Sequence, residues 1–201
     1  GKISVVEPIW SLEIPTAVFL SYIIIGEALT LAQILFIISL IIGLASVSYR
    51  GGKVKAKHFL ERGALVALVA AFCMGAANFY MGMSGRASDS LLTNFVASVV
   101  MAVVTLAYIL FKRRGKKMVA DIKLQTKSLL TMSLLDNVAW VAFVAAMTLA
   151  PIGVVVALTE SYIIIVVLLG IFINKEKLAR HQKFGLVIAL VSAIALAYVS
   201  G

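Results

Sequence analysis

Charged residues are scarce in this 201-residue chain. Only 13% of the residues are Asp, Glu, Lys or Arg, whereas 62% are hydrophobic and the mean hydropathy is +1.08. A soluble domain of this size needs about twice that share of charge to cover its surface. The composition therefore excludes an ordinary soluble domain and predicts an integral membrane protein.

Cysteine and histidine are also rare. Cys73 is the one cysteine, so an intrachain disulfide is excluded. His58 and His181 lie far apart, without the spacing of metal ligands. The sequence has no glycine-rich phosphate loop and no serine or cysteine with a recognisable base beside it. We therefore expect neither a metal nor another cofactor. An enzyme that works inside the membrane through its acids alone stays as a weak alternative.

The apolar residues form long uninterrupted runs. About 20 apolar residues span a bilayer, and in lipid such segments must be helical because every backbone group needs a partner. The sequence thus predicts an all-α integral membrane protein with seven transmembrane helices. Their approximate ranges are 3–25, 29–48, 63–84, 90–111, 128–149, 152–173 and 184–200.

The positive charge is confined to short segments between these runs. Residues 50–62, 112–127 and 175–183, together with Lys2, fall on one side of the membrane and carry all but one of the 18 Lys and Arg residues. The exception is Arg86. The positive-inside rule assigns the basic side to the cytoplasm, which places the C-terminus outside. The net charge of +9 therefore predicts a lipid bilayer as partner and no nucleic acid.

Part of the sequence recurs weakly at an offset of 149 residues. The runs 3–48 and 152–200 are the two copies, and by the charge pattern they cross the membrane in opposite directions, which is typical of inverted-repeat transporters. The matching turn residues are Glu27, Leu29 and Gln33 in the first copy and Glu176, Leu178 and Gln182 in the second.

The repeat spacing predicts the domain organisation. Residues 62–201 would form a complete five-helix unit, residues 50–61 a basic linker, and residues 1–49 the last two helices of a preceding unit. Two equal units would require three further helices before Gly1. We therefore expect the chain to be the C-terminal seven helices of a ten-helix inverted-repeat bundle.

The repeated turn also supports a family resemblance. Leu12-Glu13-Ile14-Pro15, followed by Gly26-Glu27-Ala28-Leu29-Thr30, resembles the fourth-helix signature of EamA-type transporters of the drug/metabolite transporter superfamily. Glu13 precedes Glu27 by the family's interval of 14 residues, and the proline is shifted by one position. In the second copy Tyr162 stands in place of Glu13. The resemblance implies a secondary transporter that exports small metabolites or drugs by alternating access from the plasma or inner membrane. It also implies cytoplasmic termini, which disagrees with the charge pattern.

Three acids lie deep in the predicted membrane spans. Glu13, Asp136 and Glu160 are each near the middle of a run, and no Lys or Arg lies comparably deep. Ionisable groups are costly in a bilayer and usually mark function. Without a buried cation, an anionic solute is disfavoured. We expect proton coupling, or a cationic or zwitterionic solute. Alternatively, the acids are protonated and bind neighbouring helices as structural groups.

Other side chains near these acids complete the predicted binding site. Trp140 lies one helical turn after Asp136, and an aromatic ring beside a carboxylate favours an organic cation. Asn137 adds an amide. Pro8 and Pro15 lie in the run that holds Glu13 and predict a hinge there. Packing roles are the alternative for the tryptophan. A membrane scaffold without transport activity is the main alternative function, and the oligomeric state stays open.

Overall fold

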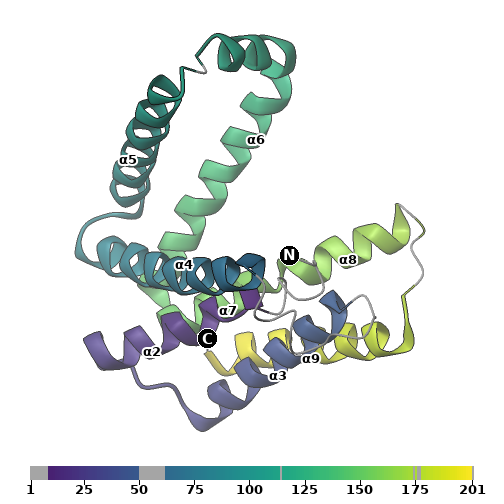
Figure 1. Ribbon diagram of the computed structural model, residues 1–201. Helices are drawn as coiled ribbons and strands as arrows, with labels where there is room; N and C mark the ends of the chain where they lie inside the picture. Colours follow the sequence, from purple (N-terminus) through teal and green to yellow (C-terminus); the bar gives the residue numbers. More distant parts are fainter. Residues whose placement is uncertain (1–8, 50–61, 114, 174, 176–177, 201) are drawn as a thin grey trace. The chain divides into compact units, whose positions relative to one another are not determined.

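A computed structural model describes residues 9–49, 62–113, 115–173, 175 and 178–200, and the account below is confined to them. Most of these residues are helical, and none of them lies in a strand. The helices are α2 (Glu13–Ile25), α3 (Leu31–Ser48), α4 (Arg62–Ala87), α5 (Ser90–Phe111), α6 (Gly115–Leu149), α7 (Ile152–Glu160), α8 (Tyr162–Phe172) and α9 (Arg180–Ser200) (Figure 1).

Six segments of the described chain are long and apolar enough to cross a membrane, and α2 is a shorter apolar helix. This confirms the predicted all-α membrane fold. Large apolar side chains cover the outside of these helices, as they do where helices face lipid or other helices. Phe111 and Leu149, for example, are 82% and 89% exposed.

The segment 112–127 was expected to be a loop, and this expectation is wrong over most of its length. Helix α6 begins at Gly115, and its backbone departs from helical geometry at Gln125, with φ −124° and ψ 25°. Lysine and glutamine are good helix formers, so a basic segment outside the membrane can continue a transmembrane helix. The charged stretch therefore marks the membrane edge without ending the helix.

The run 152–173 is likewise divided. It forms α7 and α8, separated at Ser161. In the run 3–25, α2 begins only at Glu13, after a turn at Ser11 and Leu12. Pro15 accounts for this turn, because it has no N–H to offer the Ser11 carbonyl. That carbonyl instead accepts a hydrogen bond from the Ile14 N–H at 3.3 Å.

The chain divides into two compact units. The first comprises residues 1–80 and 150–201, and the second comprises residues 81–149. Each unit is described by itself.

In the first unit, α3 and α9 lie side by side and antiparallel (Figure 1). A side chain near the start of each helix binds the end of the other: Gln33 donates to the Ser200 hydroxyl and Gln182 to the Val47 carbonyl. Midway, the hydroxyls of Ser39 and Ser192 are 2.9 Å apart.

Glycine makes this antiparallel approach close. A Cβ at Gly43 would lie 2.6 Å from the Ala189 nitrogen and 2.9 Å from the Gly185 carbonyl oxygen. A Cβ at Gly185 would in turn lie 2.8 Å from the Gly43 oxygen. Small residues at helix crossings allow such backbone contact in membranes.

The second unit consists of the end of α4 with α5 and α6. Arg86, at the end of α4, donates from Nε to the Met147 carbonyl at 2.7 Å, so it satisfies a backbone group in the last turn of α6. Gly85 allows the side chain of Val144 to approach α4 closely. Asp89 caps the start of α5 by accepting from the Leu91 N–H.

Candidate functional site: two helix breaks and a carboxyl pair

The breaks before α2 and after α7 occur at equivalent positions. Leu12 and Ser161 are 149 residues apart, the same offset as the sequence repeat. Leu12 has φ −66° and ψ −10°, and Ser161 has φ −64° and ψ −7°. The N–H of each bonds to the carbonyl three residues earlier, Ile9 or Leu158, at 3.1 Å. The backbone therefore turns in the same way at both positions, although only the first has a proline nearby.

The helix starts that follow the repeated turns are also alike. At the start of α3, the Thr30 N–H donates to the Gln33 side chain at 2.9 Å. Just before α9, the Ala179 N–H donates to the Gln182 side chain at 3.0 Å. These are equivalent positions at the offset of 149. The two glutamines were noticed in the sequence as a match, and the structure gives them the same capping function.

The two acids of the first unit meet where the broken helices cross. Helices α2 and α7 pack antiparallel, since Val18 contacts Gly153 near one end and Glu13 lies near Glu160 at the other. Glu13 is 2% exposed, and its carboxyl group lies within hydrogen-bonding reach of the Glu160 carboxyl. Because an ionised carboxylate only accepts hydrogen bonds, a bond between two carboxyl groups requires a proton on one of them.

The carboxyl group of Glu13 is only partly hydrogen-bonded. Its Oε2 has no hydrogen-bond partner in the structure, and the same holds for the buried Ser21 Oγ and Asn78 Oδ1. Ser21 lies two turns after Glu13 on the same face of α2. On α4, Gly75 contacts the Glu13 carbonyl, and Asn78 lies one turn further along that helix. Buried polar groups are normally hydrogen-bonded, so unpaired ones in a polar region indicate a place for water or solute.

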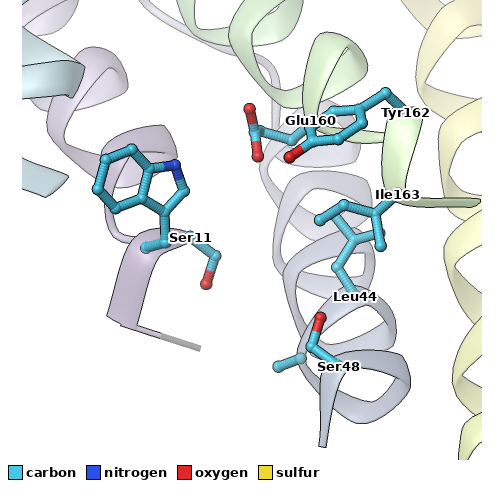
Figure 2. A pocket seen from close by; sticks show the side chains of 8 residues that line it. Ser11, Leu44, Ser48, Glu160, Tyr162 and Ile163 are labelled. Atoms are coloured by element: carbon cyan, nitrogen blue, oxygen red, sulfur yellow. The ribbon is translucent and has the colours of Figure 1, made fainter. Parts of the chain in front are cut away.

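A small cavity lies beside Glu160. It has a volume of about 10 Å³, roughly the space of one water molecule. Figure 2 shows Glu160 and Tyr162 at one end of this cavity, Ser11 across from them, and Ser48 at the other end. Its further lining residues are Trp10, Leu44, Ala45 and Ile163. Three hydroxyl-bearing residues and one acid therefore line a space about the size of one water molecule.

Glu27, in the first of the two matching turns, caps a helix far away in the sequence. Its carboxylate accepts a hydrogen bond from the Ile152 N–H at 2.8 Å, at the start of α7. The following helix, α3, is capped instead by Thr30 and Gln33. Glu176, the predicted counterpart of Glu27, lies outside the described residues.

Asp136, Asn137 and Trp140 lie in the second unit, so the structure does not relate them to the carboxyl pair. Asp136 is exposed on α6. The Asn137 side chain accepts hydrogen bonds from Asn94 at 3.2 Å and Ser98 at 3.5 Å. Trp140 packs edge-on against Phe143, with ring centroids 5.5 Å apart. A common site for all the predicted residues remains a prediction.

The hinge residues are only partly described. Pro8 lies outside the described residues, and Pro15 lies one turn after the break at Ser11 and Leu12. Sequence reasoning missed Ser11 and Ser48, because isolated serines in apolar helices carry no distinctive pattern. The offset of 149 could have indicated Ser11, since it is the counterpart of Glu160.

Together, the fold and site define a multi-pass membrane protein in which a buried acid, Glu13, meets a partly buried one, Glu160, where two helices cross. The chain belongs to the EamA-like transporter family, whose match covers residues 61–198. A comparison with curated proteins finds no match. The protein is therefore a membrane transporter of the drug/metabolite transporter superfamily, embedded in the plasma or inner membrane. The division into two repeats was predicted from the sequence and stays a prediction.

Proposed function

We propose that the protein is a secondary transporter that exports small cationic or zwitterionic metabolites or drugs in exchange for protons. The carrying observation is the contact between the carboxyl groups of Glu13 and Glu160 at the crossing of two interrupted helices. Transporters commonly bind substrate and coupling ions where membrane helices are discontinuous.

The proposed coupling is competition for negative charge. A carboxylate that binds the positive group of a solute in one state releases it when it takes up a proton. The pair suits this exchange, because its hydrogen bond already needs one proton. Loss of that proton would create a second negative charge that attracts a cation.

Asp136, Asn137 and Trp140 complete the proposed site with those acids in a cavity near the membrane midplane. One support is that all three lie near the middle of the predicted span 128–149. Another is that a carboxylate, an amide and an indole on neighbouring turns of α6 suit an organic cation. The Asn94–Asn137 hydrogen bond would hold the amide in a set orientation toward the solute.

Alternating access would come from two inverted repeats that move against each other. The support is the antiparallel pairing of α3 with α9, which are counterparts at the sequence offset of 149 residues. The matching helix breaks and matching glutamine caps add to it.

Solute flux into proteoliposomes tests this function. Radiolabelled organic cations and zwitterions are supplied outside vesicles whose lumen is acidic, with the full chain reconstituted. We expect uptake of at least one solute, driven by the pH gradient. Glu13→Gln and Asp136→Asn preserve shape while removing charge, so they should fold but lose most of the gradient-driven flux.

Asp89→Asn is the matched control, because Asp89 caps α5 at a helix end and asparagine caps equally well. Its flux should equal that of the parent protein. Normal flux by both neutral variants at every pH would contradict the proposal. It would favour a structural role for the acids. Retained function after replacement of the acids by leucine would favour the alternative, a membrane scaffold without transport activity.

A further inference from the structure

We propose that the first part of α6, residues 115–124, lies along the membrane surface and binds the headgroups of anionic phospholipids. This inference concerns the second unit alone and does not depend on the proposed function. It starts from the length of α6. Helix α5 has 22 residues, enough for one crossing of a bilayer, whereas α6 has 35 and is thus 13 residues longer. A crossing of equal length leaves these additional residues outside the apolar core of the membrane.

The additional residues lie at the start of α6. The last turn of α5 marks a membrane edge, because Tyr108 and Phe111 are exposed aromatic side chains. The Lys112 ammonium lies 6.0 Å and 5.8 Å from the centroids of their rings. The chain then turns sharply at Arg113, whose φ is 53°, and α6 begins at Gly115. The first part of α6 therefore starts at the same membrane edge from which its apolar part enters the bilayer.

A bend separates this first part from the rest of the helix. The backbone of α6 departs from helical geometry at Gln125. Residues 115–124 extend about 15 Å along their axis. Figure 1 shows the first turns of α6 crossing from the end of α5 to the longer part of α6. A helix that starts and ends at one membrane edge lies along that edge.

The first part of α6 also has an apolar face. Met118, Val119 and Ile122 share this face, because they are spaced by three and four residues. Val119 and Ile122 are 47% and 43% exposed, so the structure leaves apolar surface open there. Leu124 lies on the opposite face. Helices with one apolar face and many basic residues bind in the interface between lipid headgroups and acyl chains.

The charge of the segment selects the lipid. Residues 112–127 carry seven Lys and Arg residues and one acid, Asp121. Lys123 lies one turn after Val119, and Lys127 follows the bend; both are exposed. Lysine stems lie along apolar surface while their ammonium groups stay among the headgroups. Basic clusters of this size on an amphipathic helix bind anionic lipids, so phosphatidylglycerol should be preferred to neutral phosphatidylcholine.

The depth of three labelled positions tests this inference. Val119→Cys, Ile122→Cys and Leu124→Cys are each made in a Cys73→Ala background, which removes the only native thiol. Each full-length protein is labelled with a fluorophore and reconstituted into vesicles of phosphatidylcholine and phosphatidylglycerol in equal parts. Lipids with a nitroxide on the acyl chain quench labels that lie among the chains. We expect stronger quenching at the first two positions than at Leu124. Quenching that rises steadily from Val119 to Leu124 would indicate a helix that enters the bilayer directly, and would overturn the proposal.

The second comparison changes the charge. Vesicles of phosphatidylcholine alone should lose the quenching at Ile122→Cys, and so should Lys123→Glu combined with Lys127→Glu in anionic vesicles. Arg180→Glu with Lys183→Glu is the matched control, because it makes the same charge change in the first turn of α9. This control should keep the quenching. Circular dichroism checks that each variant is folded, and the comparison of lipids needs no charge variant.

Two outcomes of this comparison would contradict the proposal. Equal quenching at Ile122→Cys in neutral and anionic vesicles would overturn the role of anionic lipid. Labels that are shielded from both water and the nitroxide would indicate that a second copy of the chain covers this face, which also overturns the proposal. Solute flux does not enter either comparison, so failure here leaves the proposed function untouched.

Discussion

The crossing of α3 and α9 can be tested with a single methyl group. Gly43→Ala would place a Cβ 2.6 Å from the backbone nitrogen of Ala189, whereas ordinary contact begins at 3.4 Å. The backbone of Ala189 cannot rotate away as a side chain can. The two helices must therefore separate locally by about 0.8 Å, the difference between these two distances.

The energetic cost follows from this displacement. Overpacking a tight contact costs about 1–3 kcal/mol. The Ser39–Ser192 hydrogen bond, one turn away at 2.9 Å, would lengthen as well. An interhelical hydrogen bond in a membrane contributes about 0.6 kcal/mol. We expect Gly43→Ala to lower the free energy of unfolding by roughly 2 kcal/mol.

The measurement is unfolding by sodium dodecyl sulfate in mixed micelles, followed by the loss of helical circular dichroism. Gly115→Ala is the matched control, because a Cβ at Gly115 would meet no atom within 4 Å. It should leave stability unchanged or raise it slightly, since alanine is the better helix former. Equal stability of the two variants would refute the close crossing of α3 and α9.

Two further results are expected. Glu27→Ala should destabilise the protein by about 1 kcal/mol, because the Ile152 N–H at the start of α7 loses its acceptor. The same unfolding measurement checks it, and Glu27→Gln should recover part of the loss. A cysteine at Arg113, in the Cys73→Ala background, should resist an impermeant thiol reagent applied outside intact cells, since the basic side is predicted to be cytoplasmic. Labelling from outside would reverse the orientation.

The sequence predicted the helices that depend on simple physical rules. Apolar runs predicted α3 and α5 to within about two residues, because length and hydropathy decide membrane insertion. The start of α6 was missed, since charged residues mark the membrane edge but do not end a helix. The break at Ser161 was missed too, because no proline or glycine lies beside it.

The site was predictable only in part. Buried acids in an apolar run are conspicuous, so Glu13 and Glu160 could be picked out as candidates. Their contact could not be predicted, since it depends on how α2 crosses α7. Asp136 was an equally clear candidate, but its position in the middle of a predicted span does not show which helix its side chain faces. Ser11 and Ser48 line the cavity because of how their segments pack, and this packing cannot be read from one sequence alone.

Proton movement coupled to solute movement tests the central claim most directly. Proteoliposomes are loaded with a transported solute and diluted into weakly buffered medium that lacks this solute, which starts its efflux. The external pH is followed with an electrode. Exchange of solute for protons predicts that the medium becomes more alkaline as solute leaves, and that Glu13→Gln abolishes this change. Solute efflux without any pH change in the parent protein would contradict coupling through the acid pair.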